Sequence, residues 1–241
     1  MSTQIERIVP TDRVCVLIGA SHARKLAEKA FSKVKLITRK YFKFNDIITL
    51  DKELNELSEV CVIETILILA GNNLYPGKFG TDKNEQYLIT NYDCEKLQIL
   101  LSTICTVANK YSRETYFVES PPRGFKILNE DMLWYNYYSP NFRERYKYVI
   151  SKLEKVVGII RWETSLSRIL NVPTKVINPI FSSKRGQIAI FFKIYKDQTH
   201  LTDDGYQAWS KFVLEHVHRG ILLENDNGIK RHANGTFGET N

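Results

Sequence analysis

The feature that most constrains the fold is the run ETILILA at residues 64–70, in which polar and apolar residues do not alternate. A strand that faces solvent on one side does alternate, because successive side chains point to opposite faces of the sheet. A run without alternation is typical of a parallel sheet that is covered by helices on both faces. Residues 64–70 therefore predict a buried central strand of such a sheet.

Strand and helix patterns alternate along most of the remaining chain. Short apolar, β-branched runs predict strands, which we place at residues 13–18, 34–38, 64–70, 115–120 and 175–178. Apolar residues at helical spacing predict helices, which we place at residues 23–31, 46–59, 93–111, 142–156 and 203–217, with Thr202 as the N-cap of the last. Five strands interleaved with five helices predict an α/β fold, a three-layer α/β/α sandwich with a mainly parallel five-stranded sheet, as in flavodoxin-like folds.

Composition indicates one globular domain. The chain has 241 residues, 43% of them hydrophobic, which is ample for one large core. No linker or internal repeat divides it, so we expect a single domain at residues 1–224 and a disordered, polar tail at residues 225–241. The N-terminal residues lack the apolar core of a signal peptide, and the longest apolar run is too short to span a bilayer. We therefore expect a soluble, cytoplasmic protein.

Cysteines and charge limit the classes of ligand. Four single cysteines occur without a C-x-x-C pair or histidines at zinc-binding spacing, so we expect reduced thiols, no metal site and no cofactor; they are Cys15, Cys61, Cys94 and Cys105. Lysine and arginine outnumber aspartate and glutamate by 34 to 27, which gives a net charge of +7. This excess favours polyanionic partners such as RNA or DNA, although it says nothing of the fold.

Three short polar segments are expected at one edge of the sheet. They are GASH at residues 19–22, AGNN at residues 70–73 and DQTH at residues 197–200. In a parallel sheet, ligands bind beyond the carboxyl ends of the strands. A hydrolytic serine needs a base, an acid that orients the base, and donors for the oxyanion. The three segments contain all of these residue types, so they indicate serine hydrolase chemistry.

Each residue of this set has a catalytic and a structural interpretation. Ser21 would be the nucleophile, His200 the base and Asp197 the acid, while the Ser21 N–H and the Asn73 side-chain amide would form the oxyanion hole. Alternatively, Ser21 only starts a helix, Asn73 braces loops and Asp197 is a solvated acid. His22 is expected to be a structural or pocket-wall histidine and not the base, because neighbouring residues at a helix start point in different directions.

With these residues in place, the chain resembles the SGNH hydrolase superfamily of GDSL-like esterases and lipases, over roughly residues 13–218. GASH matches the family's first block, Gly-Asp-Ser, and DQTHL at residues 197–201 matches its fifth block, Asp-x-x-His-Leu. The third block, Gly-x-Asn-Asp, is matched by Gly71-Asn72-Asn73-Leu74. The resemblance implies a serine esterase that acts on an acyl ester without a cofactor.

The chain departs from the family pattern at several positions. Ala20 replaces the aspartate of the first block, and Leu74 replaces that of the third. The family's second block supplies a glycine N–H to the oxyanion hole, but no glycine lies between Gly19 and Gly71. A backbone N–H from residues 39–45 can take that role, because the donor belongs to the main chain. Loss of one donor slows such enzymes by roughly 10²–10³.

The alternative hypothesis is a nucleic-acid-binding module on the same scaffold. Cations that neutralise phosphates lie beside aromatic residues that can stack on bases; the candidates are Arg39, Lys40, Lys43, Arg143, Arg145, Lys184 and Arg185. Among SGNH-like domains, forms resembling the OSK domain of Oskar proteins have lost the triad and bind RNA, and some retrotransposon proteins carry esterase domains. In the competing interpretation, the aromatic residues would pack in the core or line an acyl pocket, and the charges would be solvated.

Overall fold

A computed structural model describes residues 12–29, 34–38, 44–70, 91–121, 125–128, 131–134, 140–177, 193–197 and 200–216. The tail predicted at residues 225–241 lies outside this part of the chain. The limits of the single domain therefore stay a prediction.

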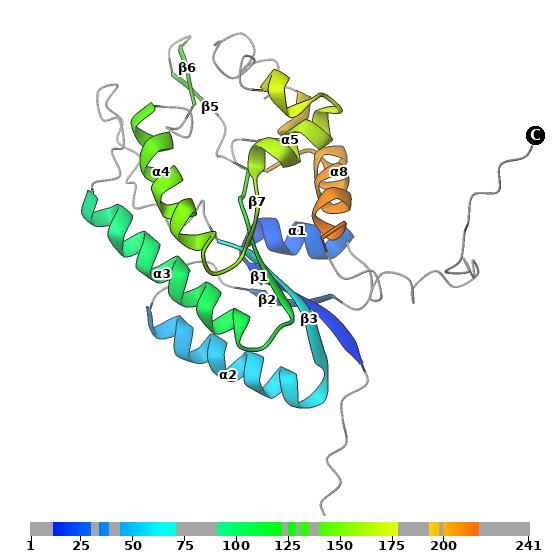
Figure 1. Ribbon diagram of the computed structural model, residues 1–241. Coiled ribbons are helices and arrows are strands. Elements are labelled where there is room, and N and C mark those ends of the chain that lie inside the picture. Colours follow the sequence, from blue (N-terminus) through cyan, green and yellow to red (C-terminus); the bar gives the residue numbers. More distant parts are fainter. Residues whose placement is uncertain are drawn as a thin grey trace, which may run out of the picture.

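The described strands form a five-stranded sheet in which every pairing is parallel, in the order β2-β1-β3-β4-β7 (Figure 1). They are β1 (Arg13–Gly19), β2 (Val34–Thr38), β3 (Val62–Leu69), β4 (Glu114–Val118) and β7 (Gly158–Ile160). The strand β3 is central, and it is buried over residues 63–69 as its unbroken apolar run predicts. The predicted fold class, an α/β sandwich on a five-stranded parallel sheet, is confirmed.

The predicted fifth strand is wrong. Residues 174–177 form a helical turn, and the fifth strand is β7, which has three residues. The β-branched sequence KVIN favours a strand, but Pro173 opens a turn in which its carbonyl accepts from the Val176 N–H at 2.9 Å. The sequence GII of β7 follows a helix closely and is too short for a periodicity to reveal it.

Helices of the described part of the chain cover both faces of the sheet (Figure 1). On one face lie α2 (Phe44–Val60), α3 (Asn91–Asn109) and α4 (Pro140–Leu153), and on the other lie α1 (Ser21–Lys29), α5 (Trp162–Leu170) and α8 (Asp203–Leu214). Five of these helices are predicted, with ends shifted by a few residues. The short helix α5 is not, and neither is the antiparallel hairpin of β5 (Phe125–Leu128) and β6 (Asp131–Trp134), because both have too few residues to show a clear period.

The two faces of the sheet have different cores. The core beneath α2, α3 and α4, here called the aliphatic face, is built from Ile, Leu, Val, Ala and Cys, with Phe117 as its one fully buried aromatic among the described residues. The core beneath α1, α5 and α8, here called the aromatic face, includes five buried aromatic side chains, which are Trp162, Tyr195, Tyr206, Trp209 and Phe212. Cys15 is buried in the aromatic face, and Cys61 and Cys105 are buried in the aliphatic face.

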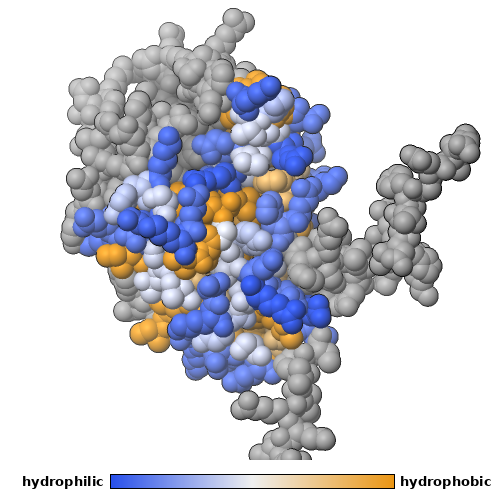
Figure 2. Space-filling model, in the orientation of Figure 1, coloured by the Kyte–Doolittle hydropathy of each residue, from blue (hydrophilic) through white to orange (hydrophobic). Residues whose placement is uncertain are grey.

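The described surface is mainly polar. Large apolar side chains that are exposed there are Ile48, Val60, Ile99, Tyr148 and Val176. Figure 2 shows hydrophobic patches interrupted by hydrophilic side chains, which is ordinary for a protein surface. No helix in the described ranges is long and apolar enough to cross a membrane.

Candidate active site

Ser21 lies where β1 passes directly into α1. Gly19 makes this turn possible, because a Cβ at Gly19 would lie 2.6 Å from the Leu69 carbonyl oxygen and 2.9 Å from the Ala23 Cβ. The Ala20 carbonyl accepts from the Arg24 N–H at 3.0 Å, so Ser21 is the first residue of the helix. The N–H groups of a first helical turn have no acceptor within the helix, and they point toward the space beyond the strand. Ser21 is partly exposed there.

The sheet topology places this turn at the point where ligands usually bind. The strands β1 and β3 are neighbours in the sheet; α1 follows β1 and α3 follows β3, and these two helices lie on opposite faces. The connections therefore diverge at the carboxyl ends of β1 and β3, and a crevice forms at such a switch point in doubly wound sheets. Ser21 follows one of these ends directly.

A compact loop before α8 carries Asp197 and His200. Its two sides are joined by an antiparallel bridge between Tyr195 and Leu201, and the Thr202 N–H donates to the Ile194 carbonyl at 2.8 Å. Thr202 then caps α8 as predicted, since its Oγ1 accepts from the Gly205 N–H at 3.1 Å. The loop is thus tied at its base to a helix that packs against α1.

Asp197 and His200 form a hydrogen-bonded pair within this loop. The Nδ1 atom of His200 lies 2.9 Å from Oδ2 of Asp197, and the His200 N–H donates to Oδ1 at 2.7 Å. A carboxylate at Nδ1 holds the proton of a neutral imidazole on that nitrogen, so Nε2 is left as the acceptor. The side chains are 36% and 51% exposed for His200 and Asp197, so Nε2 can meet a ligand.

The ring of His22 connects the turn that carries Ser21 with the loop that carries His200. It follows Ser21 directly, and its centroid lies 5.7 Å from that of His200. Ser21 and His200, both within the described part of the chain, do not form a hydrogen bond with each other. Hydrogen bonds between catalytic groups are often long in ligand-free enzymes and tighten when substrate binds.

His22 is buried among aromatic side chains, and the sequence alone did not reveal its partners. Its Nδ1 lies 2.8 Å from the Tyr206 hydroxyl, and its ring meets Trp209 edge to face with centroids 5.9 Å apart. Trp209 packs in the same way against Trp162 at 6.0 Å. The residues Gly205-Tyr206 after the DQTHL segment were the only available signal, because His22 and Tyr206 are 184 residues apart in the chain.

The sequence did not predict a role for Glu119, a buried carboxylate directly after β4. Glu119 is 1% exposed, and its Oε2 accepts from the Trp162 N–H at 2.7 Å, at the first residue of α5. Its Oε1 lies 3.6 Å from Nη1 of Arg161. An acid here stabilises the positive end of the helix, and it orients α5 against the sheet. The signal in the sequence was the acid that ends the apolar run TYFVES.

Several predicted site residues cannot be placed. Asn73, Arg39, Lys40, Lys43, Lys184 and Arg185 lie outside the described residues, as do residues 39–43 of the segment that was expected to supply a donor; residues 44 and 45 of that segment begin α2. Arg143 and Arg145 fall on α4, of which the backbone alone is described at these positions. The role of all seven basic residues in binding nucleic acid stays a prediction.

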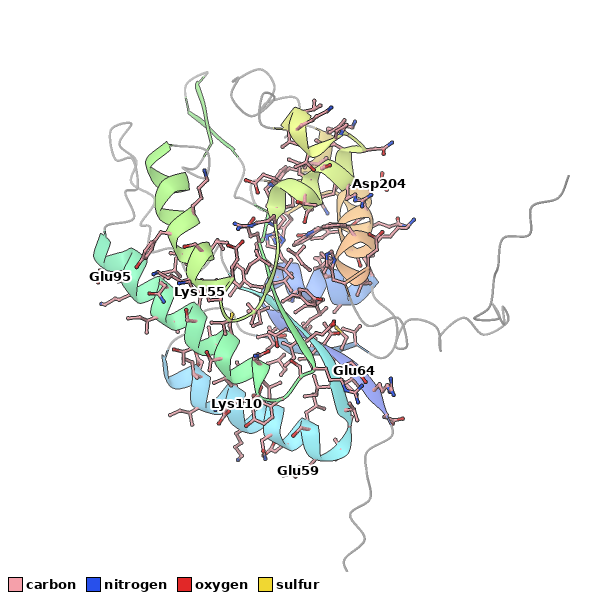
Figure 3. The ribbon with its side chains drawn as sticks, in the orientation of Figure 1. Glu59, Glu64, Glu95, Lys110, Lys155 and Asp204 are labelled. Carbon is pink, nitrogen blue, oxygen red and sulfur yellow. The ribbon has the colours of Figure 1, made fainter. Side chains whose placement is uncertain are left out.

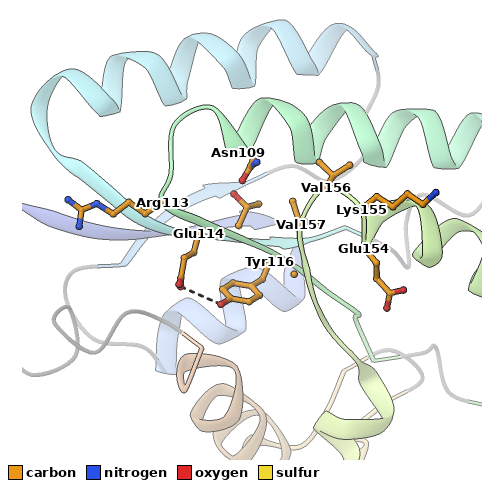
Figure 4. Close-up of a pocket in the computed structure, with 10 residues that line it drawn as sticks. Asn109, Arg113, Glu114, Tyr116, Glu154, Lys155, Val156 and Val157 are labelled. Atoms are coloured by element: carbon orange, nitrogen blue, oxygen red, sulfur yellow. Dashed lines mark hydrogen bonds between the residues drawn. The ribbon is translucent and has the colours of Figure 1, made fainter.

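Charged residues also gather at the amino ends of the strands, away from Ser21. Glu64 of β3 is buried, and its Oε1 lies 3.4 Å from Arg13 and 3.3 Å from Arg113 (Figure 3). Beside it, an open cavity of about 420 Å³ lies between the starts of β4 and β7 (Figure 4). Tyr116 and Lys155 are among its lining residues. Within the described ranges, no cluster of three or more His, Cys, Asp or Glu residues could hold a metal ion.

Comparison with protein-family models and with curated proteins gives no match. Solved structures with a similar arrangement include a protein of Parabacteroides merdae described as a GDSL-like lipase, with 14% identity and a TM-score of 0.48 over 86% of this chain and 96% of that chain. The acetylxylan esterase Axe2 of Geobacillus stearothermophilus has 10% identity and a TM-score of 0.46, over 87% and 95%. A platelet-activating-factor protein of Streptococcus pneumoniae has 18% identity and a TM-score of 0.47, over 88% and 86%. The case for a function therefore depends on the residues of the site.

Proposed function

We propose that the protein is a serine esterase of the SGNH type, with Ser21 as nucleophile, His200 as general base and Asp197 as the acid that orients His200. The observation that carries this proposal is the Asp197–His200 pair, whose imidazole centroid lies 5.7 Å from the ring of the residue after Ser21. This proximity supports the proposal, because it relates Ser21, His200 and Asp197 to the same edge of the sheet although they lie far apart in the sequence. This is the edge at which α/β folds bind ligands.

The proposed reaction has two halves. Ser21 Oγ attacks the acyl carbon of the ester while its proton passes to Nε2 of His200. The imidazolium then gives this proton to the alcohol oxygen as the ester C–O bond breaks, which leaves an acyl group on Ser21. Water attacks the acyl carbon in the second half, and His200 moves the proton in the same way, which releases the acid and restores Ser21. Asp197 keeps Nδ1 protonated and stabilises the transient positive charge on His200.

Backbone and side-chain donors would stabilise the negative oxygen of each tetrahedral intermediate. The Ser21 N–H is at the start of α1, where the helix provides both an unpaired donor and a positive partial charge. The Asn73 amide is the second proposed donor, on the basis of its motif. Each such donor is worth roughly 10²–10³ in rate.

We propose that the Ser21–His200 hydrogen bond forms through a local change of the serine side chain. Rotation of Ser21 about χ1 moves Oγ among three staggered positions without moving α1. The loop of His200 is held by backbone hydrogen bonds, and its ring is oriented by Asp197. We therefore expect the serine side chain, and not the histidine, to adjust when substrate binds.

A fluorophosphonate probe tests the nucleophile, because it phosphonylates serines that an adjacent base activates. We expect the wild-type protein to be labelled and Ser21→Ala not to be, with the label on Ser21 in a tryptic peptide. Ser151→Ala is the matched control, since Ser151 lies on α4 and its hydroxyl only donates to the Tyr148 carbonyl. Equal labelling of the Ser21→Ala variant, or no labelling of the wild type, would contradict the proposal.

Hydrolysis of p-nitrophenyl acetate tests the turnover that labelling does not. Ser21→Ala and His200→Ala should each lose most of the activity, and the double variant should lose little more than either, because the residues act as a unit. Additive losses would show that the two residues act separately. Such a result would exclude the proposed relay.

A further inference from the structure

The hydrogen bond between His22 and Tyr206 lies against the proposed base and has no role in the reaction described above. It joins α1, directly after Ser21, to the first turn of α8, directly after the loop of His200. Both residues are buried, His22 at 6% and Tyr206 at 1% exposure. A polar pair that is removed from water in this way is costly unless each member is satisfied.

The direction of this hydrogen bond follows from the partners of Tyr206. Burial raises the pKa of the Tyr206 hydroxyl above its ordinary value, although a backbone hydrogen bond from Leu201 acts in the opposite direction. Tyr206 therefore keeps its proton at neutral pH, and the buried O–H must donate. The Leu201 N–H is itself a donor, whereas Nδ1 of His22 can accept at 2.8 Å. With the hydroxyl as donor to Nδ1, His22 would carry its own proton on Nε2.

In their neutral forms, the two neighbouring histidines would then carry their protons on opposite ring nitrogens. Asp197 keeps the proton of His200 on Nδ1, and Tyr206 keeps that of His22 on Nε2. Among the described residues, the titratable groups near His22 are Tyr206 on α8 and His200 with Asp197 in the loop, while Tyr195 and Glu28 lie near Tyr206. A neutral His22 matters, because a positive charge 5.7 Å away would oppose the charge that His200 takes on in the proposed reaction.

We propose that His22 is a positioning residue for His200, held by the Tyr206 hydroxyl as a neutral Nε2–H tautomer. It acts through its ring, which braces the His200 ring beside Ser21 without adding charge. The effect of His22 on catalysis rests on the esterase function proposed above. The tautomer of His22 and its contact with the His200 ring do not depend on that function. This role depends on the histidine that directly follows the serine in GASH, so it belongs to this particular sequence.

Ring ¹⁵N chemical shifts measured by NMR from pH 5 to 9 test the tautomers without any substrate. We expect His22 protonated on Nε2 and His200 on Nδ1 in the wild type. Tyr206→Phe removes only the hydroxyl, so it should abolish the single tautomer of His22 and shift or broaden the His200 signals. Tyr111→Phe is the matched control, because it removes a hydroxyl that donates to Asp51 at 3.0 Å, and Tyr111 packs against the core of the aliphatic face. It should leave both histidines unchanged.

Substitutions of His22 separate hydrogen bonding from packing. His22→Asn places an acceptor near the position of Nδ1, whereas His22→Leu keeps apolar volume and removes the acceptor. We expect the His200 signals of His22→Asn to resemble those of the wild type more closely than the signals of His22→Leu do. In Tyr206→Phe, we expect kcat to fall by about 3- to 10-fold at unchanged KM, which is the range expected for the loss of one hydrogen bond. Should Tyr206→Phe fail to fold, the Asn and Leu pair carries the same comparison.

The outcomes distinguish this inference from the proposed function. If the His200 signals are the same in Tyr206→Phe, His22→Leu and the wild type, His22 does not position His200, whether or not the protein is an esterase. A charged His22 at pH 7 in the wild type would overturn the inference as well. If the NMR result is as expected but Ser21 is not labelled by the probe, the proposed esterase function fails and the positioning role stands.

Discussion

The two faces of the sheet are packed with different side chains, and only one of them carries the candidate site. The core of the aliphatic face, under α2, α3 and α4, consists mainly of aliphatic side chains, and such side chains have no hydrogen-bonding groups. The aromatic face buries tyrosine, tryptophan and histidine under α1, α5 and α8, and the polar ends of Tyr206 and His22 form a hydrogen bond with each other. The first face therefore contributes mainly hydrophobic stability, whereas the second holds chemical groups in position.

Polar-tipped aromatic residues suit a face that borders a site. A tyrosine or histidine buries a large apolar body and presents a polar group at one end, so it can reach from the core to the edge of the sheet. Tyr206 does this from α8 and meets His22 on α1. A leucine in either position would fill the space without fixing the orientation of its neighbour. We therefore expect substitutions on the aromatic face to lower mainly the activity, and substitutions on the aliphatic face to lower mainly the free energy of unfolding.

The largest expected effect is on the activity of a variant of the aromatic face. His200→Ala should lower the rate of acetyl ester hydrolysis by roughly 10³–10⁴ because it removes the base of the proposed reaction. The free energy of unfolding should change by less than about 0.5 kcal/mol, since a half-exposed loop side chain contributes little to packing. Hydrolysis assays and urea unfolding measure the two quantities. A large loss of stability would show that His200 is a structural residue.

Leu101→Ala on the aliphatic face should give the opposite result. Leu101 is 1% exposed on α3, so its truncation leaves a cavity, and we expect a loss of about 2–5 kcal/mol in the free energy of unfolding. Activity per folded molecule should be unchanged. Ile99→Ala is the matched control on the same helix, because Ile99 is 51% exposed and its truncation should cost less than about 0.5 kcal/mol. A loss of activity in folded Leu101→Ala would break the comparison between the faces.

Gly19→Ala should affect stability and activity together. Its Cβ would meet the Leu69 carbonyl oxygen at 2.6 Å, and both of these backbones belong to the centre of the sheet. We expect a loss of roughly 1–3 kcal/mol, together with a fall in hydrolysis because the displaced turn carries Ser21. Gly205→Ala offers a comparison, since its contacts at 3.1 Å are less severe. An unchanged activity in Gly19→Ala would show that the turn need not hold its present geometry.

The smallest expected effect is on the reactivity of two thiols, one in each face. Burial raises the pKa of Cys15 and that of Cys105 to about 12, so both remain protonated at pH 8. In a background with Cys61→Ala and Cys94→Ala, we expect neither thiol to react with a disulfide reagent until the protein unfolds. Reaction of one before the other would identify the face that opens first.

The same two thiols predict the direction in which the free energy of unfolding changes with pH. Their pKa values are higher in the folded protein than in the unfolded chain, so the folded state binds more protons above about pH 9. The free energy of unfolding should therefore fall as pH rises from about 9 to 12, and replacement of both cysteines by alanine should reduce that slope. A slope that both replacements leave unchanged would assign the effect to other groups.

The sequence by itself determined the central strand, the parallel sheet and the segments that carry the candidate site. An unbroken apolar run needs no distant information to predict burial on two faces, and Asp197 orients His200 within three residues of chain. The amphipathic helices were predictable for the same reason, because their periodicity is local. The strand β7 and the helix α5 were not, because segments of three and nine residues acquire their structure from the elements they pack against.

Only the tertiary structure decided what surrounds the proposed base. Residues 22 and 206 are 184 positions apart, and no local pattern in either segment indicates that a hydroxyl there meets an imidazole at 2.8 Å. Their contact requires α1 and α8 to pack on the same face of the sheet, which depends on how the whole chain is wound. Local periodicity determines which groups a segment can present, whereas the packing of the layers determines which of those groups meet.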